Sequence, residues 1–239
     1  MRARFSPAIV AENARGFICV IPDLKCASPK EGDLLQGRDP VETAKTLVGC
    51  GAPALSVVTE RERFGGSPAL LNAVARAVDV PVLRKDFITD EGMIAETAAL
   101  GASAVLLICA LLDEKALGRL YEKANELKLE PLVEVCSARE MEWARKCGAR
   151  LVGINNRDIM ALELDDGGPA RTAALAAGAP AGSLLVSESG ILTRPDAMLA
   201  ASAGANAVLV GTALWRAHDM GAMYRSLHVR RRATPCAPS

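Results

Sequence analysis

Residues 104–135 read AVLLICALLDEKALGRLYEKANELKLEPLVEV, and this stretch decides the fold. It starts with an apolar run, Ala104–Ile108, and ends with a second one, Leu132–Val135. Between them, Glu114–Lys128 carries apolar residues at helical spacing, which form one stripe along a helix: Ala116, Leu117, Leu120, Ala124 and Leu127. Short, almost wholly apolar runs on either side of a helix are typical of parallel strands covered on both faces. The stretch therefore predicts one strand–helix–strand unit of a parallel sheet.

The same alternation continues through the chain in both directions. The pattern predicts strands at Phe17–Pro22, Ala54–Val58, Val80–Leu83, Ala104–Ile108, Leu132–Val135, Leu151–Ile154, Leu184–Ser187 and Ala207–Val210. Eight strands alternating with helices indicate an α/β protein of the (β/α)8 TIM-barrel class. An open doubly wound sheet is the alternative, but it needs a glycine-rich turn after its first strand, and residues 23–29 contain no glycine.

The length fits one barrel-type domain or two small ones, and the eight-strand pattern favours a single domain over residues 1–239. Within it we expect a short lead-in over residues 1–15 and a disordered tail over residues 229–239. Glycines commonly follow the predicted helices, where they supply the left-handed geometry of a helix cap; Gly101 and Gly204 are examples.

Composition and charge exclude several classes of protein. The 28 basic and 28 acidic side chains cancel, which argues against a general nucleic-acid binder. No apolar stretch is long enough for a membrane span, and the start of the chain lacks a signal-peptide core. Seven scattered cysteines and two histidines near the C-terminus offer little for a zinc site. We expect a cytoplasmic protein with no nucleic-acid or membrane partner, and the oligomeric state stays open.

Charged and polar side chains follow the predicted strands. In such a barrel the active site forms where strands end and the following loops begin. Two lysines, three carboxylates and an amide occupy these positions: Asp23, Lys25, Lys85, Glu134, Asn155 and Glu188. Buried charges need partners, so their gathering at one rim predicts a catalytic cluster.

Plain structural roles are the alternative for individual members of this cluster. Lys25 and Lys85 would then form ion pairs that close the rim, and Asn155 and Asn156 would form a turn. Asp86 alternates to the opposite face from Lys85, which indicates a structural role for it.

A second signal indicates phosphate binding. In these barrels a phosphate often lies on the loops after the seventh and eighth strands. Ser189-Gly190 and Gly211-Thr212 stand at those places and let backbone N–H groups approach an anion, and Ser28 adds a hydroxyl from the first loop. Gly190 has the alternative reading of an ordinary turn glycine. The pattern predicts a small phosphorylated substrate.

Three motifs make the sequence recognisable: Lys85-Asp-Phe, Gly153-Ile-Asn-Asn-Arg and Glu188-Ser-Gly-Ile. In this order and spacing, and with the first-strand stretch Ile21–Pro29, they resemble the indole-3-glycerol phosphate synthase family over residues 17 to 227. The resemblance implies a TIM-barrel carboxy-lyase of tryptophan and aromatic amino acid biosynthesis. Such an enzyme converts 1-(2-carboxyphenylamino)-1-deoxyribulose 5-phosphate to indole-3-glycerol phosphate by decarboxylating ring closure and dehydration, without a metal or organic cofactor.

The resemblance also implies roles for the catalytic cluster. Lys85 would protonate the ketone carbonyl while the aromatic ring carbon attacks it, and Glu134 would assist ring closure or deprotonation. Lys25 would hold a substrate carboxylate or act as the second acid in the dehydration. Asp23 takes the place of the family's first-strand glutamate. Asn155 and Glu188 would complete the polar site.

The remaining implied contacts are to the substrate. They involve the phosphate (Ser28, Gly190, Gly211, Thr212), the apolar parts (Phe64, Phe87, Leu106) and further polar groups (Arg157, Ser189).

Several positions depart from the family pattern. The usual Ala-Glu of the first strand is Pro22-Asp23, the basic or polar residue after the lysine is Cys26, and Cys136 replaces a histidine. The lead-in is also shorter than the family's leading helix, which covers the barrel mouth. Two alternatives therefore stand beside the family reaction. One is a paralogue acting on a modified anthranilate or another phosphorylated substrate, and the other is a barrel that binds a phosphorylated ligand without turnover.

Overall fold

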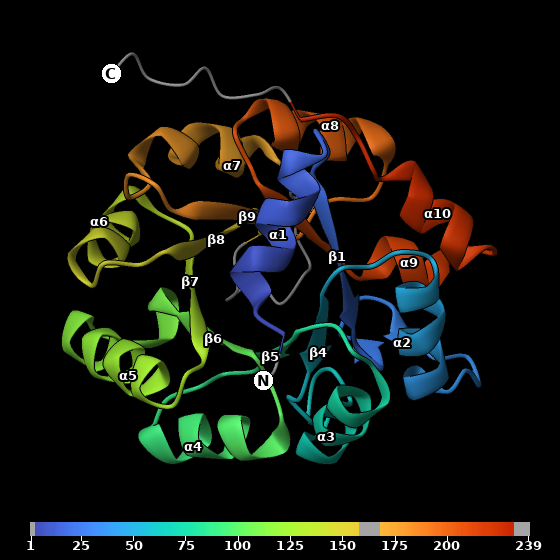
Figure 1. Ribbon diagram of the computed structural model, residues 1–239, viewed down its shortest axis with the longest axis horizontal. Coiled ribbons are helices and arrows are strands. Elements are labelled where there is room, and N and C mark those ends of the chain that lie inside the picture. The colour runs from blue at the N-terminus through green and yellow to red at the C-terminus, as the bar shows by residue number, and fades with distance from the viewer. Residues whose placement is uncertain (1–2, 158–167, 232–239) are drawn as a thin grey trace.

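The computed structural model, which describes residues 3–157 and 168–231, is a closed parallel barrel surrounded by helices (Figure 1). Around the barrel the strands follow the order β1-β10-β9-β8-β7-β6-β5-β4, and β4 pairs again with β1. Their bounds are β1 Cys19–Leu24, β4 Leu55–Val58, β5 Val82–Lys85, β6 Ala104–Ile108, β7 Glu130–Val135, β8 Leu151–Asn155, β9 Leu184–Glu188 and β10 Ala207–Val210. The predicted (β/α)8 TIM barrel is confirmed.

Each predicted strand has a barrel strand at its place, although some ends differ. The first strand continues through Asp23, and the third reaches Lys85. Both extensions carry polar residues, which an apolar pattern does not mark as strand. Phe17 was predicted to begin the first strand but forms an antiparallel bridge with Arg230 instead, outside the barrel.

Helices connect the strands and form the outer ring visible in Figure 1. They are α2 Pro40–Gly49, α3 Pro68–Ala77, α4 Glu91–Leu100, α5 Glu114–Glu126, α6 Ala138–Lys146, α7 Ala170–Leu175, α8 Arg194–Ser202, α9 Thr212–Arg216 and α10 Met220–Ser226. Short 3-10 turns lie at Cys109–Leu111 and Ala176–Gly178. Ser, Thr or Asp caps many of these helices by accepting a backbone N–H, as Asp113 does for α5. No helix of the described chain is long and apolar enough to cross a membrane.

Alternation along each strand sorts side chains between the barrel interior and the helices. In β1, Cys19 and Ile21 belong to the interior cluster, whereas Val20 and Leu24 pack in the cluster under the helices. Because successive side chains point to opposite faces of a strand, Asp23 continues the interior row at its carboxyl end. The fold thus directs the polar strand ends into the barrel mouth.

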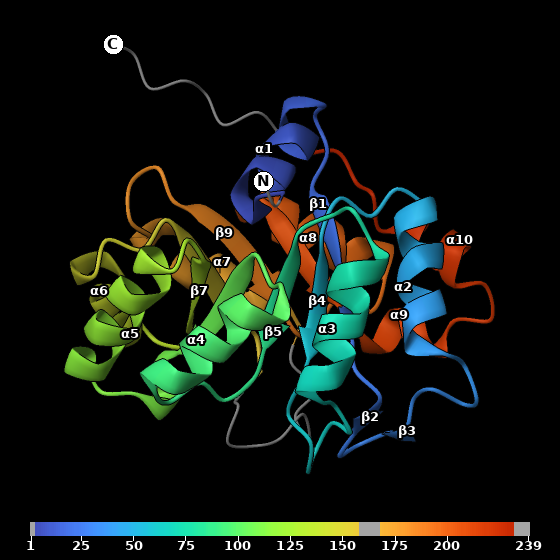
Figure 2. The ribbon, with the colours of Figure 1, turned by 60° about the horizontal axis from the view of Figure 1, so that its bottom comes forward.

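The amino-terminal end of the barrel is covered by helix α1, Phe5–Ala14. Phe5 and Ile9 are fully buried in the interior cluster, and Glu130 accepts hydrogen bonds from the backbone N–H groups of Phe5 and Ser6, at 2.6 and 3.1 Å. In Figure 2, α1 lies at one end of the barrel and the hairpin β2–β3 (Ala27–Ser28 and Gly32–Asp33) at the other. The described part of the lead-in therefore lies opposite the mouth.

The start of the expected C-terminal tail pairs with the segment ahead of β1. Ile18 donates its backbone N–H to the carbonyl of Val229, and Arg231 donates to the carbonyl of Gly16. The rest of that tail, residues 232–239, lies outside the described residues.

Candidate active site

The six polar residues predicted at the rim all come from the carboxyl ends of barrel strands or the residues directly after them. Five of them are buried, and Lys85 is half-buried. The strand register pairs Asp23 with Ser56, Val58 with Lys85 and Asn155 with Glu188. A hollow at the mouth is lined by both lysines and by residues of the predicted phosphate loops: Asp23, Lys25, Lys85, Arg157, Ser189, Gly190, Gly211 and Thr212. One hollow therefore joins Asp23 and the two lysines to the predicted phosphate loops.

Two glutamates share the interior of this mouth with an asparagine. The side-chain amide of Asn155 donates to Oε1 of Glu134 at 3.1 Å. Oε2 of Glu134 and both oxygens of Glu188 are buried without a hydrogen-bond partner among the described residues. Burial raises the pKa of Glu188 well above its ordinary value, Glu134 raises it further, and Lys85 acts in the opposite direction. Glu188 is thus a buried carboxyl group beside a second carboxyl group, and its surroundings favour its protonated form.

Asp23 is held at the end of β1 by neighbours on both sides. The hydroxyl of Ser56 donates to its Oδ1 at 2.7 Å, and the indole of Trp215 donates to its backbone carbonyl at 3.0 Å. A side chain at Gly211 would crowd this corner, because a Cβ there would lie 3.2 Å from Cε of Lys25 and 3.4 Å from Oδ2 of Asp23. The glycine lets the two polar residues and the last loop meet.

The turn after β9 has an unusual backbone. Ser189 adopts φ +64° and Gly190 adopts φ +71°, and the left-handed region is uncommon for a serine. Asn156 holds this turn by donating from its side-chain amide to the carbonyls of Glu188 and Ser189, at 2.9 and 3.1 Å. Its own carbonyl oxygen accepts from the backbone and hydroxyl of Thr172. Asn156 therefore fixes the conformation of the predicted phosphate turn.

Ser28 and Thr212 occupy the other predicted phosphate positions. Ser28 is buried in the short strand β2, and its hydroxyl accepts from the backbone of Glu31 at 3.2 Å. Thr212 is the first residue of α9, directly after Gly211.

Two aromatic side chains of the strand-end loops stand beside a lysine and an arginine. Lys25 Nζ lies 5.9 Å from the centre of the Phe64 ring, and the guanidinium of Arg63 lies 5.3 Å from that of Phe87. The carbonyl of Phe64 also accepts the backbone N–H of Ala27, which ties the second loop to the first. Phe64 and Phe87 thus supply apolar surface next to the cationic groups.

Two predicted substrate contacts occupy different depths. Leu106 is fully buried in the interior cluster, and the register places it beside Leu132, one layer below the pair Ile108 and Glu134. Arg157 lines the mouth and is buried, with its backbone N–H donating to Oδ1 of Asn155.

Asp86 lies outside this cluster, as strand alternation predicted. It pairs with the buried Arg84 at 3.1 Å and accepts from the hydroxyl of Thr59. Lys85, between Arg84 and Asp86 in sequence, takes the interior side.

Sequence reasoning missed Ser56, Gly153 and the positioning role of Asn156. For Asn156 the sequence indicates only a turn-forming role. The sequence signal for Gly153 was its place between apolar strand residues, where glycine marks a close approach by another group.

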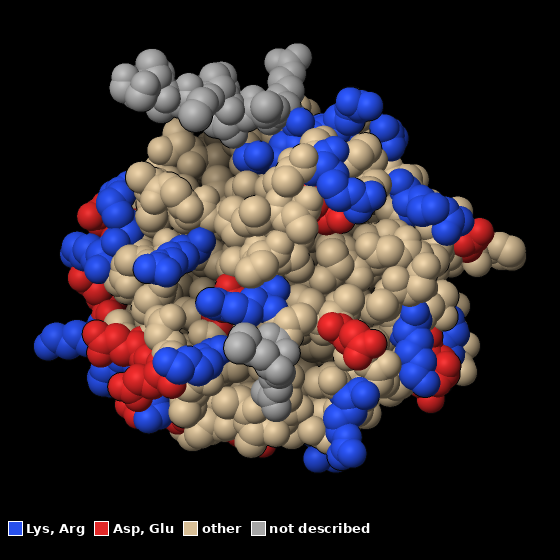
Figure 3. All heavy atoms as spheres, in the orientation of Figure 1, with Lys and Arg blue, Asp and Glu red and all other residues tan. Residues whose placement is uncertain are grey.

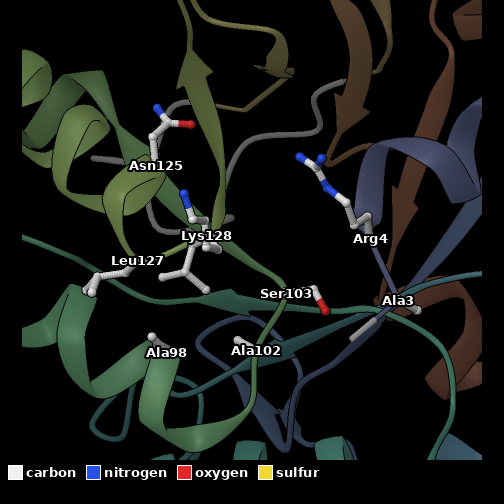
Figure 4. Close-up of a pocket in the computed structure, with 9 residues that line it drawn as sticks. Ala3, Arg4, Ala98, Ala102, Ser103, Asn125, Leu127 and Lys128 are labelled. Carbon is white, nitrogen blue, oxygen red and sulfur yellow. The ribbon is translucent and has the colours of Figure 1, made fainter. Parts of the chain in front are cut away.

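The larger hollows lie at the opposite end of the barrel, the face shown in Figure 3. One of about 730 Å³ runs beside α1 past Arg4, Tyr121 and Glu130. Another, of about 500 Å³, is lined by Arg4, Ser103 and Lys128 among others (Figure 4). The hollow at the mouth is much smaller, about 40 Å³. The two lysines predicted as catalytic groups line this small hollow and neither of the two larger ones.

Comparison with known proteins decides the family. The family model described as indole-3-glycerol phosphate synthase matches residues 3–227. The chain belongs to the indole-3-glycerol phosphate synthase family. It is a carboxy-lyase of the indole-3-glycerol phosphate synthase type, and the resemblance seen in the sequence motifs is confirmed.

Individual relatives agree with this assignment. Proteins named indole-3-glycerol phosphate synthase from Carboxydothermus hydrogenoformans and Pyrococcus furiosus are 43% and 44% identical to it. These matches cover 90% and 84% of this chain, and 80% and 87% of the relatives. A relative of the same name from a Nocardioides species is 46% identical, over 84% of this chain and 76% of its own length. The alternative of a paralogue with another phosphorylated substrate is not favoured by these matches.

Proposed function

We propose that the mouth cluster converts 1-(2-carboxyphenylamino)-1-deoxyribulose 5-phosphate to indole-3-glycerol phosphate, carbon dioxide and water, with Lys85 and Lys25 as the two proton donors. The observation that carries this assignment is the shared hollow: both lysines line it together with the Ser189-Gly190 and Gly211-Thr212 turns. A substrate anchored by its phosphate on those turns would extend toward the lysines, so the reacting carbons would lie where protons are available.

In the first step the substrate's ring carbon forms a bond to the ketone carbon. Lys85 gives its proton to the ketone oxygen, which becomes a hydroxyl group. The carboxylate leaves as carbon dioxide, and its bonding electrons restore the aromatic ring. Glu134, oriented by Asn155, would stabilise the positive charge that develops on the substrate's ring system during the attack.

In the second step the new hydroxyl is lost. Lys25 supplies the proton with which it leaves as water, and Glu134 accepts the proton that the adjacent carbon gives up to complete the indole. Asp23 lies close to Lys25 across Gly211, and Ser56 orients its carboxylate. Asp23 therefore holds Lys25 in place and balances its charge.

The remaining residues bind the substrate. Ser28, Gly190, Gly211 and Thr212 would receive the phosphate, whose charge suits backbone N–H groups and hydroxyls. Phe64, Phe87 and Leu106 would contact the apolar parts, and Ser189 and Arg157 the polar ones.

We propose further that the enzyme works in the cytoplasm and has no nucleic-acid partner. The described cysteines are free thiols, which supports a reducing compartment and hence the cytoplasm. The zero net charge supports a small-molecule enzyme without a nucleic-acid partner.

The test is turnover of the purified protein with the carboxyphenylamino-deoxyribulose 5-phosphate substrate, followed by indole fluorescence. We expect product from the unmodified chain and a loss of kcat of about 1000-fold in Lys85→Ala, the size of a general-acid contribution. Lys45→Ala is the matched control, because Lys45 is an exposed helix residue paired with Glu42. Absence of product at high enzyme concentration would overturn the function, and undiminished turnover in Lys85→Ala would overturn the mechanism.

A further inference from the structure

Glu134 and Glu188 come from strands that are not neighbours. Glu134 is on β7 and Glu188 is on β9, with β8 between them. Adjacent strands lie about 4.8 Å apart, so the two backbones are separated by about 10 Å. The carboxyl groups nevertheless interact directly enough for Glu134 to raise the pKa of Glu188. The two carboxyl groups can approach each other only if the residue of β8 between them leaves enough space.

Gly153 occupies the crossing point. It pairs with Glu134 on one side and with Val186 on the other, one interior layer below the pair Asn155 and Glu188. The Glu188 side chain therefore reaches back over Gly153 toward β7. A Cβ at Gly153 would overlap Oε1 of Glu188 and lie 3.1 Å from its Cδ, closer than separate groups pack in a protein interior.

Its backbone conformation does not require glycine here. Gly153 is absent from the glycines with positive φ and lies inside a regular strand, where glycine costs stability relative to residues with side chains. The close approach of the Glu188 carboxyl is the feature that a side chain would destroy.

We propose that Gly153 is a positioning residue for the reaction: its missing side chain forms the niche that holds the Glu188 carboxyl buried against β8 and beside Glu134. The proposal rests on the proposed function for its catalytic consequence, but the niche itself is a property of the resting protein.

By holding the Glu188 carboxyl in place, the niche influences whether that group is protonated and therefore how much negative charge the mouth carries. The charged groups that act on Glu188 are Glu134 from β7, Lys85 from β5 and Asp23 from β1. Beside it, β8 contributes the uncharged Asn155 and β10 contributes Leu209. Burial and the neighbouring carboxylates favour the protonated form of Glu188, and Lys85 alone opposes them.

A protonated Glu188 can donate a hydrogen bond to Glu134, whose Oε2 has no partner among the described residues. The two glutamates then carry one negative charge between them. If both were ionised, the extra charge near Lys85 would make that lysine hold its proton more tightly and donate it less readily. Gly153 thus acts on the proton donor through Glu188.

The test is Gly153→Ala, with the carboxyl of Glu188 titrated by NMR in protein labelled with 13C at glutamate side-chain carboxyls. Glu188→Gln assigns the signal, because it removes that resonance. We expect the pKa of Glu188 to fall toward its ordinary value by about one unit or more, because the methyl group displaces the carboxyl from its buried niche. Turnover should fall by about 10- to 100-fold, the cost of a displacement near 1 Å, and the pH profile of kcat should shift with the titration.

Gly118→Ala is the matched control. Gly118 lies in α5, and a Cβ added there would have no atom of a neighbouring group within 4 Å, so neither the titration of Glu188 nor turnover should change. Gly153→Ala should fold, since the displaced atoms are the end of a flexible side chain and Leu132 stands at an ordinary 3.5 Å. An unchanged titration of Glu188 in the folded variant would overturn the proposal.

If Gly153→Ala folds poorly, the double variant Gly153→Ala with Glu188→Ala decides the question. Removing the carboxyl should restore the melting temperature to that of Glu188→Ala alone, and failure to restore it would show that the clash lies elsewhere and overturn the niche. The titration needs no substrate. A shifted titration in a protein without turnover would therefore overturn the proposed function and leave the niche standing.

Discussion

Strand β7 carries a glutamate at each of its two ends, and the two have opposite surroundings. Glu130, at the amino-terminal end, accepts backbone hydrogen bonds from Phe5 and Ser6 and pairs with Arg4. Glu134, at the mouth, has one oxygen bonded to Asn155 and the other without a partner among the described residues. Both side chains are buried, so burial alone does not separate them.

The difference lies in how completely each carboxylate is satisfied. Glu130 caps the first turn of α1, where both of its oxygens are used and its charge complements the helix dipole. One carboxylate oxygen of Glu134 accepts no hydrogen bond from the described residues, and it lies near a second carboxyl group. A buried charge with unused hydrogen-bonding capacity destabilises the fold, and such groups are typical of active sites. The contrast supports a structural role for the amino-terminal end and the proposed catalytic role for the carboxyl end.

The contrast between Glu130 and Glu134 predicts the largest loss of activity for a substitution at Glu134. Glu134→Gln keeps the size of the side chain and the contact with Asn155 but removes the charge. We expect kcat/KM to fall by about 100- to 1000-fold, since a base or charge-stabilising group contributes on this scale. The unfolding free energy should stay within about 1 kcal/mol of its original value, because a neutral amide is cheaper to bury than a carboxylate. Steady-state kinetics and urea denaturation measure both, and retained activity would place Glu134 with Glu130 as a structural residue.

Asn156 holds the predicted phosphate turn and also supports the fold, so its substitution should lower both activity and stability, each by an intermediate amount. Asn156→Ala removes hydrogen bonds to Glu188, Ser189 and Thr172, all of them buried or partly buried. We expect the unfolding free energy to drop by about 2 to 3 kcal/mol, because several groups lose their partners. KM should rise about tenfold, since the Ser189 turn is no longer held for the phosphate.

Ligand binding distinguishes the effect of Asn156 on the phosphate turn from its effect on stability. Affinity for inorganic phosphate, measured by calorimetry, should fall together with that for substrate in Asn156→Ala. A loss of stability with unchanged KM and phosphate affinity would show that Asn156 supports the fold alone.

The smallest effect is expected at the amino-terminal end. Glu130→Ala removes the cap of α1 and should lower the unfolding free energy by about 1 to 2 kcal/mol, the usual cost of a lost helix cap. Because the proposed site lies at the other end of the barrel, kcat/KM should remain within about twofold of its original value. Thermal denaturation and the fluorescence assay measure the two quantities. A large loss of activity with preserved stability would contradict the division between the two ends.

Much of the fold and part of the site could be predicted from local sequence. Short apolar runs marked the place of every barrel strand, because a strand covered on both faces excludes polar residues over most of its length. The same rule gave wrong ends where polar residues enter the mouth, as at Asp23 and Lys85. Strand alternation separated Lys85 from Asp86, since neighbouring residues of a strand face opposite sides.

Other features depend on contacts between distant parts of the chain. The pairing of Phe17 with Arg230 links residues from the two ends of the sequence, and apolarity gave no sign of it. The role of Gly153 depends on how far Glu188 reaches across β8, which no spacing along one strand reveals. Asn156 looked like a turn former because its partners lie on β9 and α7.

The sequence by itself determined that this chain forms a parallel barrel, at which end of it the predicted catalytic residues lie, and to which family it belongs. These follow from short apolar runs, from helical spacing and from short motifs, all of which can be recognised within a few residues of one another. Only the tertiary structure decided which buried glutamate is satisfied and which is not. Glu130 accepts hydrogen bonds from backbone N–H groups of helix α1, whereas oxygens of Glu134 and Glu188 have no donor among the described residues. Which hydrogen-bond donors lie near each carboxyl group depends on how the elements pack across the barrel.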